Sequence, residues 1–403
     1  MKKPALHWQI LISLVLAVFF GLFLPNQVKY LFWMGDLFLR ALKMVIIPLI
    51  LSSIITGMTN IGSAGNLGRI GIKTLAYYVT TSLFAIITGL VMVNLLKPGV
   101  GADLGLSQTV EGLGVAQESF GNTLLRMVPK NIFAAFANGE MLSVIFFALL
   151  FGFFIIKVDK KYADFLTTGF NAVFEVMMKI TMFIIKFAPL GVFGIVSKVV
   201  STQSDLLHLG ERMGIYVVTI LLAMAIHIFI TLPLIVKVVG RAKPFQHLSN
   251  MSTPLLTAFS TASSSATLPL TMEAVEHRSG VSNQISSFTL PLGATVNMDG
   301  TALYECVAAM FIAQAYGVEL ALGEQLIVII TALLASIGAA GIPMAGLVML
   351  SVILSAVGLP MEGVGLILAV DLPLDMLRTA TNVWSDSCGA VVIAKSEGET
   401  LTV

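Results

Sequence analysis

Five polar residues recur at helical spacing near the C-terminus, within otherwise apolar sequence. They are Asp371, Asp375, Arg378, Asn382 and Asp386, separated by steps of four and three. A helix would project all five side chains from one stripe of its surface. Burying a charge in hydrocarbon costs about 2.5–3.5 kcal/mol on insertion scales, so these groups must face protein, water or a ligand. We therefore interpret the stripe as one wall of a binding site.

The composition indicates a polytopic membrane protein. Of the 403 residues, 57% are hydrophobic and only 11% are charged, whereas a soluble domain averages about 25% charged residues. The net charge of +1 argues against nucleic acid as a partner and leaves membrane lipid as the expected surroundings. We expect an all-α fold, because helices satisfy their own backbone groups in a bilayer.

Six apolar stretches are long enough to cross a bilayer, since a span needs about 20 residues. Lys2 and Lys3 precede the first stretch, which lacks a small-residue cleavage site and is therefore expected to be a retained helix. Basic clusters on alternate loops, such as 157–161 and 237–243, place those loops and both termini in the cytoplasm. The segment 97–129 is interpreted as an extracellular loop with a short re-entry. The six stretches are 8–25, 30–57, 72–97, 131–157, 163–199 and 210–239.

Cysteine and histidine carry no predicted chemistry. Cys306 and Cys388 both lie in apolar sequence, which predicts buried thiols rather than a disulfide or a metal site. The histidines follow no helical or chelating pattern, so we assign them no role and expect no bound transition metal. They are His7, His208, His227, His247 and His277.

Two apolar stretches in the C-terminal half are interrupted by small residues and proline. The first interruption covers 263–270 and reads SSSATLPL, and the second covers 336–346 and reads SIGAAGIPMAG. Irregular backbone at membrane depth is tolerated only beside protein or a water-filled cavity, so both predict re-entrant hairpins. Taken alone, the triple serine also fits a small-residue packing surface between helices. A pair of broken segments, however, indicates a midplane site in an inverted-repeat transporter.

A third interruption, over 293–301, combines Asn297, Asp299 and Gly300. An unwound turn exposes backbone carbonyls, and with a nearby carboxylate it offers oxygen ligands to a small cation. Sodium is the expected ion. The alternative is a helix kink in which a buried partner neutralises Asp299. Asp386 offers a second carboxylate for binding the cation, which favours the ion site.

Several motifs occurring together in this order resemble the glutamate transporter family, the dicarboxylate/amino acid:cation symporters. They are the serine-rich and Gly-Ile-Pro tips, the segment Asn297-Met-Asp-Gly-Thr301 and the stripe Asp375-Met-Leu-Arg-Thr379. The resemblance extends over essentially the whole chain. Further matching motifs are Pro48-Leu-Ile through Thr56-Gly57, and Tyr77-Tyr-Val-Thr-Thr-Ser82.

The resemblance implies eight transmembrane helices, two re-entrant hairpins and inverted repeats in a homotrimer that works as an elevator-type transporter. It assigns 1–70 to scaffold helices 1 and 2, and 71–98 to helix 3 of a transport domain. Residues 99–204 would hold scaffold helices 4 and 5 with the extracellular loop. Residues 205–403 would form the transport-domain core, with hairpins around 246–276 and 322–352 and broken helices over 282–315 and 361–395.

For the substrate, the resemblance implies that Arg378 pairs with a side-chain carboxylate and Asp375 with an amino group. A guanidinium binds a carboxylate through two parallel hydrogen bonds, so Arg378 indicates an acidic amino acid such as L-aspartate or L-glutamate. Three residues would hydrogen-bond the remainder, namely Thr301, Thr379 and Asn382. The two tips would hold the α-carboxylate through Ser263, Ser264, Ser265, Ala340, Gly341, Ile342, Pro343 and Gly346.

The resemblance also implies two to three sodium sites and no organic cofactor. One would use the carbonyls of Gly293, Asn297 and Asn382 with the Asp386 carboxylate. A second would lie between Thr295 and the carbonyls of Ser336, Ile337 and Ala339, where Ala339 replaces a family threonine without removing a backbone ligand. A third would be formed by Tyr78, Thr81, Ser82, Asn297 and Asp299.

Glu305 lies one helical turn beyond Thr301 and is similar to the glutamate that animal members use as a proton carrier. A buried carboxyl group is more easily protonated than an exposed one and can shuttle a proton. A protonated hydrogen-bond donor is the equally weighted alternative. Ala262 and Met376 depart from the family, which places an arginine at one position or the other, and this absence leaves Arg378 without a second cation.

Three other functions compete with acidic amino acid symport. An intramembrane aspartyl protease would need a Gly-x-Gly-Asp motif that the chain lacks, so we expect no enzyme and no catalytic residue. A channel needs a continuous pore, which broken hairpins around an occluded site do not favour. A proton-coupled C4-dicarboxylate symporter of the same fold is the main alternative, although Asp375 favours an amino group. The compact loops suggest a bacterial inner membrane.

Overall fold

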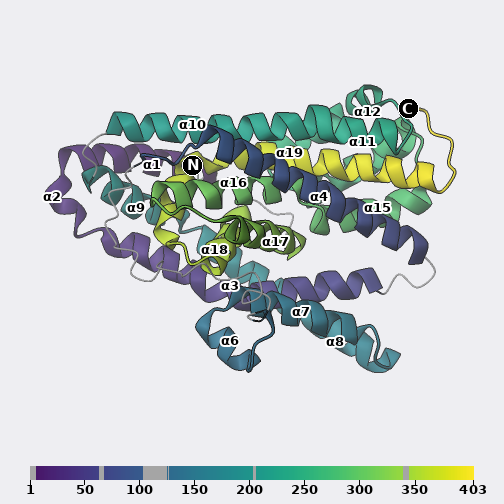
Figure 1. The fold of residues 1–403 in the computed structure, drawn as a ribbon, viewed down its shortest axis with the longest axis horizontal. Coiled ribbons are helices and arrows are strands. Elements are labelled where there is room, and N and C mark those ends of the chain that lie inside the picture. Colours follow the sequence, from purple (N-terminus) through teal and green to yellow (C-terminus); the bar gives the residue numbers. More distant parts are fainter. Residues whose placement is uncertain (1–5, 63–67, 103–124, 126, 203–205, 339–344) are drawn as a thin grey trace, which may run out of the picture.

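The fold is a bundle of helices that run mostly along one long axis (Figure 1). The computed structural model describes residues 6–62, 68–102, 125, 127–202, 206–338 and 345–403. These residues contain helices and connecting turns and no strand. The expected all-helical architecture is therefore confirmed for this part of the chain.

The described residues of the N-terminal half form eight helices, of which α3 and α4 are the longest. Pro48 lies inside α3, where the lost backbone donor does not end the helix. The helices are α1 (Leu6–Phe23), α2 (Pro25–Val28), α3 (Phe32–Gly62), α4 (Gly68–Leu96), α6 (Ile132–Asn138), α7 (Met141–Ile155), α8 (Lys160–Ile185) and α9 (Ala188–Thr202).

The C-terminal half is divided into more and shorter elements before one long final helix. It begins with α10 (Leu206–Ile226), the π-helical turn η2 (His227–Thr231), α11 (Leu232–Val238), α12 (Pro244–Asn250), α13 (Ser252–Thr261), α14 (Ser264–Glu273) and the π-helical turn η3 (Ala274–Arg278). It continues with α15 (Asn283–Val296), α16 (Asp299–Ala315), α17 (Leu322–Gly338), α18 (Ala345–Ala356), the 3-10 turn η4 (Met361–Gly363) and α19 (Val364–Ser396).

Among the described residues, four helical stretches are long and apolar enough to cross a membrane, namely 32–59, 69–96, 160–185 and 207–238. Shorter apolar helices accompany them at 8–23, 143–155, 188–202 and 322–336. Large apolar side chains such as Phe165 and Phe183 of α8 are exposed, as expected for surfaces that face lipid. These observations agree with a polytopic membrane protein.

Two predicted spans are wrong in detail. The stretch 163–199 forms two helices, α8 and α9, because Pro189 lacks a backbone N–H and is accommodated in the first turn of a new helix. The stretch 131–157 is divided at Gly139, which adopts a left-handed φ of 71° and ends α6. Most of the predicted extracellular loop at 97–129, including its re-entry, lies outside the described residues.

The breaks predicted from small and polar residues are present wherever the chain is described. Ala262 has a left-handed φ of 49° between α13 and α14, and Ser263 caps α14 by accepting a hydrogen bond from the Ala266 N–H. Asn297 and Met298 separate α15 from α16. The second tip, 339–344, lies between α17 and α18 and outside the described residues.

The helix predicted to be broken over 361–395 is instead continuous as α19, after one 3-10 turn at its start. Pro373 lies within it and removes only one backbone donor. Local side-chain bonds accompany the helix, because the Thr379 and Thr381 hydroxyls donate to the Asp375 and Leu377 carbonyls at 2.9 and 2.8 Å. All five residues of the polar stripe therefore belong to one rigid element.

The helices pack as two groups that contact each other. In the first group α3 packs against α7, α8 and α9, and α9 also packs against α1. In the second group α4 packs against α10 and α16, while α19 packs against α13, α15 and α16. Figure 1 shows α10, α4 and α19 along one side of the molecule and α3, α7 and α8 along the other.

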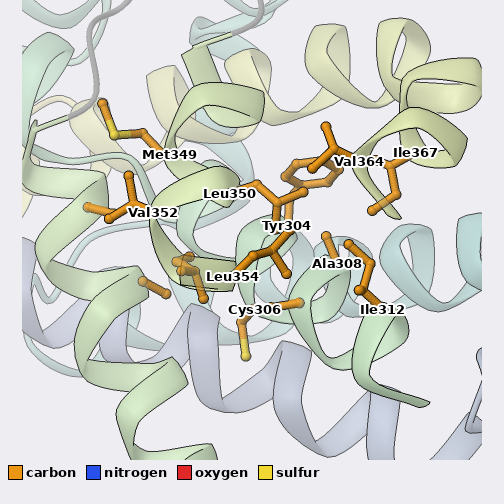
Figure 2. Close-up of a cluster of buried hydrophobic side chains, with 14 of the residues drawn as sticks. Tyr304, Cys306, Ala308, Ile312, Met349, Leu350, Val352, Leu354, Val364 and Ile367 are labelled. Atoms are coloured by element: carbon orange, nitrogen blue, oxygen red, sulfur yellow. The ribbon is translucent and has the colours of Figure 1, made fainter. Parts of the chain in front are cut away.

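The helix α16 is buried over nearly its whole length, since every residue from Asp299 to Ala313 is buried. Figure 2 shows its apolar residues, among them Cys306 and Ile312, packed against α18 and the start of α19. Because α16 is surrounded by protein, its polar residues Asp299, Thr301 and Glu305 cannot face lipid. They must be satisfied by neighbouring helices or by a ligand.

Candidate functional site

The polar stripe of α19 is buried as predicted. Asp371, Asp375, Arg378, Asn382 and Asp386 are each at most 6% exposed. Charged groups are rarely buried to this extent without a partner or a function. The helix therefore presents the whole stripe to the interior of the second helix group.

Arg378 is held by two carboxylates of its own helix. Its Nη1 donates to Asp371 Oδ1 at 3.0 Å, and its Nη2 donates to Asp375 Oδ1 at 2.6 Å. The guanidinium lies over the ring of Tyr304, with its central carbon 3.8 Å from the ring centroid. A side chain at Gly346 of α18 would begin 3.0 Å from Nη1, so α18 closes on the guanidinium only because this residue is glycine.

One polar atom of the arginine cluster, Arg378 Nε, has no hydrogen-bond partner among the described residues. The Tyr304 hydroxyl lies beside the Asp371 carboxylate, to which it can donate. Two carboxylates also face a single guanidinium, which leaves one negative charge unmatched within this group. An unsatisfied buried polar atom costs about 1–3 kcal/mol, so the cluster is suited to take up a charged polar ligand.

The unwound turn at Asn297–Met298 is attached to the stripe by Asn382. The Gly300 N–H donates to Asn382 Oδ1 at 2.8 Å, and Asn382 Nδ2 donates to Thr301 Oγ1 at 3.2 Å. Thr301 and Asn382 are thus brought together as predicted. Thr379 is also buried, and its hydroxyl donates within α19 to the Asp375 carbonyl.

The serine-rich break approaches the unwound turn from another side. Ser264 is buried, and its hydroxyl donates to the Ala294 carbonyl of α15 at 3.1 Å. Ser265 is exposed, whereas Ser263 accepts the capping bond at the start of α14. The three serines therefore have different surroundings in the structure, and Ser265 is the most exposed of them.

The second break is described only at its two ends. Ser336 is buried in the last turns of α17, where its hydroxyl donates to the Leu333 carbonyl at 2.8 Å, and Ile337 follows in the same helix. Thr295 is exposed at the end of α15, a helix that packs against α17. The other candidate residues here, Ala339, Ala340, Gly341, Ile342 and Pro343, lie outside the described residues.

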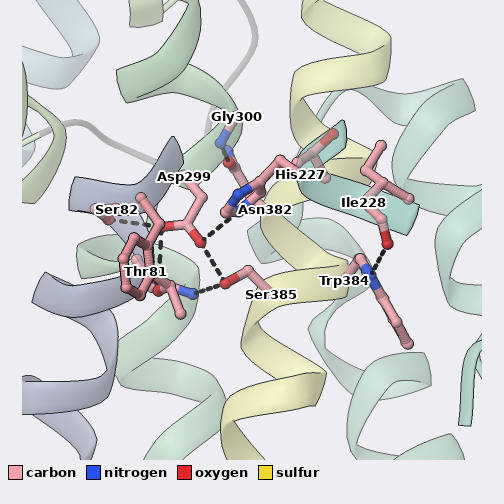
Figure 3. A network of polar contacts seen from close by, with 12 residues as sticks. Thr81, Ser82, His227, Ile228, Asp299, Gly300, Asn382, Trp384 and Ser385 are labelled. Atoms are coloured by element: carbon pink, nitrogen blue, oxygen red, sulfur yellow. Dashed lines mark hydrogen bonds and ion pairs between the residues drawn. The ribbon is translucent and has the colours of Figure 1, made fainter. Parts of the chain in front are cut away.

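A cluster of buried oxygen atoms joins α4 to the unwound turn (Figure 3). Ser82 Oγ donates to Asp299 Oδ1 at 2.6 Å. Thr81 Oγ1 lies 3.3 Å from the same carboxylate oxygen and 3.4 Å from Asn297 Oδ1. Tyr78 is equally buried, and its hydroxyl donates to the Thr289 carbonyl of α15 at 2.7 Å. The residues predicted for the third cation site are therefore neighbours.

Asp386 and Gly293 form a second oxygen-rich point beside the first. Asn297, which belongs to the Asp299 cluster, donates from Nδ2 to Asp386 Oδ1 at 2.9 Å. It therefore connects the Asp299 cluster to the Asp386 carboxylate. A Cβ atom at Gly293 would lie 2.4 Å from Asp386 Oδ1 and 2.7 Å from the Tyr78 hydroxyl. Only glycine permits this approach of backbone to carboxylate.

The ligand types in both places suit a small hard cation. They are carboxylate, hydroxyl, amide and backbone oxygens, which bind such ions, and the described residues contain no group of three His, Cys, Asp or Glu side chains that would hold a transition metal. Each cluster carries one carboxylate among neutral oxygens. This donor set fits a monovalent ion such as sodium.

The sequence analysis missed three residues of the site. Tyr304 packs against the Arg378 guanidinium, Ser385 donates to Asp299 Oδ2, and the third is His227. His227 is fully buried, and its Nε2 lies 3.1 Å from Asp299 Oδ2 (Figure 3). A single histidine within an apolar helix has no pattern that marks it as functional. The sequence analysis assigned no chemistry to the five histidines, and the structure places one of them, His227, in contact with the Asp299 cluster.

Glu305 lies in α16 with both carboxyl oxygens buried and without a hydrogen-bond partner among the described residues. If Glu305 were a permanently protonated hydrogen-bond donor, as in the alternative interpretation, its carboxyl group would have no acceptor among the described residues. Cys306 and Cys388 are buried free thiols, as predicted.

Comparison with known proteins agrees with this arrangement. The model of the sodium:dicarboxylate symporter family matches residues 6–396. The chain belongs to the sodium:dicarboxylate symporter family.

Similar members of this family include bacterial and animal transporters. The chain is 36% identical to the proton/sodium-glutamate symport protein of Geobacillus stearothermophilus, over 99% of this chain and 96% of that protein. It is 34% identical to the proton/glutamate-aspartate symporter of Escherichia coli, over 98% of this chain and 93% of the relative. It is 38% identical to human excitatory amino acid transporter 3, over 91% of this chain and 79% of that protein.

Proposed function

We propose that this member of the sodium:dicarboxylate symporter family is a sodium-coupled symporter of acidic amino acids, with L-aspartate and L-glutamate as substrates. The names of its relatives in Geobacillus stearothermophilus and Escherichia coli refer to glutamate and to glutamate and aspartate. Membership of a transporter family also leads us to infer transport rather than catalysis.

The pairing of Arg378 with Asp375 is the observation that carries the choice of substrate. The two side chains are in contact, with 2.6 Å between Nη2 and Oδ1. An acidic amino acid brings a carboxylate for the guanidinium and an ammonium for the carboxylate, so it can replace this ion pair by two matched pairs. Thr301, Thr379, Asn382 and the two helix breaks would then bind the rest of the substrate.

A C4-dicarboxylate fits this geometry less well. It would pair with Arg378 but would place a second negative charge near Asp375 and Asp371, with no ammonium to compensate it. Like charges in a buried site are strongly unfavourable. We therefore keep proton-coupled C4-dicarboxylate transport as the second candidate.

For the coupling ions we propose the three sodium sites that the family resemblance implies. The clusters around Asp299 and Asp386 support two of them, because each combines one carboxylate with neutral oxygens. The remaining site, between Thr295 and the end of α17, rests on the contact of α15 with α17. Glu305 is the proposed proton carrier, supported by its burial and by the lack of a partner for either carboxyl oxygen among the described residues.

We further propose an elevator mechanism in a homotrimer with eight transmembrane helices and two re-entrant hairpins. Residues 1–70 and 99–204 would form the scaffold, and residues 71–98 and 205–403 the transport domain. The two helix groups support this division, because α4 packs with the C-terminal helices rather than with its sequence neighbour α3. We place the protein in a bacterial inner membrane, surrounded by lipid and with both termini in the cytoplasm.

Uptake of labelled L-aspartate into proteoliposomes tests this proposal. One arm imposes an inward sodium gradient, and parallel arms impose a potassium gradient alone or a proton gradient. We expect uptake that depends on sodium and is competed by L-glutamate but not by succinate. Uptake driven by protons alone would overturn the sodium assignment. Competition mainly by succinate would overturn the substrate assignment and support the C4-dicarboxylate alternative.

The proton arm also tests Glu305. Glu305→Gln retains the size of the side chain and removes the titratable group. We expect it to retain sodium-driven uptake and to lose any acceleration by an inward proton gradient. A proton effect of unchanged size in this variant would exclude Glu305 as the carrier.

A further inference from the structure

His227 connects the proposed sodium site at Asp299 to a helix that contributes no predicted sodium ligand. It is the first residue of the π-helical turn η2, which directly follows α10. Its side chain and that of Asp299 are both completely buried, and the two residues are 72 positions apart in the sequence. A contact of this kind between two buried side chains is maintained only by the packing around it.

The direction of the hydrogen bond follows from the chemistry of its partners. A carboxylate only accepts hydrogen bonds, so His227 Nε2 must carry the hydrogen that it shares with Asp299 Oδ2. The other ring nitrogen, Nδ1, has no partner among the described residues. The contact therefore requires an N–H at Nε2, and such an N–H cannot itself bind a cation.

The π-helical turn explains why the ring is held in this orientation. The Leu232 N–H bonds to the His227 carbonyl, five residues earlier, which is the π-helical spacing. The next bond of this type would join Pro233 to the Ile228 carbonyl, and proline has no N–H to donate. Trp384 Nε1 of α19 donates to that carbonyl instead, at 3.2 Å (Figure 3).

This anchoring point is next to the second donor of the carboxylate. Ser385, the neighbour of Trp384, donates to Asp299 Oδ2 at 2.6 Å. His227 and Ser385 thus both bind Oδ2, whereas Ser82 and Thr81 face Oδ1. Hydroxyl groups can rotate and offer a lone pair to a cation, but the imidazole N–H can only donate. The two oxygens of Asp299 therefore have different roles.

We propose that His227 is a positioning residue for sodium: it fixes Asp299 Oδ2, so that Oδ1 faces the oxygens of Thr81, Ser82 and Asn297. The inference rests on the proposed function, because it assumes that the Asp299 cluster binds the coupling ion. Removal of a donor that holds a metal-binding carboxylate in place typically lowers metal affinity by about 10–100-fold.

The test compares the sodium affinity of three His227 variants, each as purified, full-length protein. The readout is the sodium concentration at the midpoint of thermal stabilisation, measured without substrate and with choline chloride holding the ionic strength constant, because a bound ion stabilises the folded state. His227→Leu removes the donor, His227→Asn is too short to reach Asp299, and His227→Gln retains an N–H at about the reach of Nε2. The sodium dependence of aspartate uptake is measured in parallel.

We expect His227→Leu and His227→Asn to raise the midpoint by about 10–100-fold, and His227→Gln to stay close to the parent protein. At saturating sodium the KM for aspartate should change little in all three. Equal impairment of all three variants would indicate a packing role and overturn the inference, as would parent-like sodium binding in His227→Asn. Asp299→Asn distinguishes failure of the proposed sodium site from failure of the inference about His227. If Asp299→Asn binds sodium like the parent protein, the proposed site is wrong. If Asp299→Asn loses sodium binding while the His227 variants keep it, only the inference about His227 fails.

Discussion

At the residue scale, the charge arrangement around Arg378 determines what the site can bind. One guanidinium is shared by Asp371 and Asp375, and all three groups are buried. The family arginine that is absent at both Ala262 and Met376 would have supplied a second cation. Because it is missing, Arg378 alone compensates two carboxylates. A replacement that removes its charge should therefore disturb the charge balance as well as the proposed substrate binding.

The prediction at this scale concerns Arg378→Cys. Loss of two charge-assisted hydrogen bonds should weaken L-aspartate binding by about 100-fold or more, because each contributes about 1.5–3 kcal/mol. Binding of L-serine, which has no carboxylate in its side chain, should be spared. Competition of labelled substrate by both amino acids in proteoliposomes measures the two affinities.

A matched double variant controls for charge balance in that experiment. Arg378→Cys alone leaves Asp371 and Asp375 buried without a cation, and breaking a buried pair costs about 3–5 kcal/mol of stability. Arg378→Cys combined with Asp371→Asn removes one of these charges and should recover part of the thermal stability. If the double variant still prefers aspartate to serine, Arg378 is not the acidic-substrate determinant.

At the element scale, the site depends on interrupted helices that bring backbone close to charged side chains. The α15–α16 break at Asn297 and Met298 and the α13–α14 break at Ala262 both point toward α19, which is continuous. Gly293 marks the tightest approach, since Asp386 Oδ1 and the Tyr78 hydroxyl occupy the space of a Cβ atom. The last turn of α15 is therefore positioned against the proposed sodium site to within the size of a methyl group.

Gly293→Ala should consequently weaken sodium binding more than it weakens folding. The added methyl group must displace Asp386 or α15, and overpacking of this type costs about 1–3 kcal/mol. We expect a higher sodium requirement in thermal-shift titrations and in uptake. The control is Gly214→Ala in α10, where no atom lies within 4 Å of the new Cβ. A similar sodium midpoint in both variants would contradict the proposed ion site.

At the scale of the whole molecule, Glu397, which directly follows α19, ties the end of this helix to the start of α4. Glu397 pairs with Arg69 and, at 2.7 Å, with Lys73. Hydrogen bonds from Lys73 and Arg69 hold the pKa of Glu397 below its usual value. The ion pairs thus connect two helices of the proposed transport domain that are more than 300 residues apart in sequence.

The stability that these ion pairs contribute should depend on pH in a defined direction. The folded-state pKa of Glu397 is lowered, so the contribution is complete above the unfolded value of about 4.3 and is lost as pH falls through the folded value. The Tm of the parent protein should therefore exceed that of Glu397→Gln near neutral pH and converge with it at acidic pH. Choline chloride should reduce the difference by screening. A Tm difference that grows on acidification would contradict this assignment.

Properties that depend on neighbours in sequence were predictable. The spacing of the α19 stripe implied one buried face. Small and polar residues marked the break at Asn297 and indicated a break over 263–270, which the structure confines to Ala262 and Ser263. Each follows from backbone geometry over a few residues. Membrane character followed from composition in the same way.

The contacts between distant segments were decided only by the tertiary structure. No local sequence pattern marks His227. The role proposed for it depends on the π-helical turn η2, in which Pro233 leaves the Ile228 carbonyl to accept a hydrogen bond from Trp384, close to Asp299. The continuity of α19 through Pro373 and the division of 163–199 likewise escaped prediction. The physical reason is that local rules fix which conformations a segment can adopt, whereas the packing of all helices together selects the partners of each buried polar group.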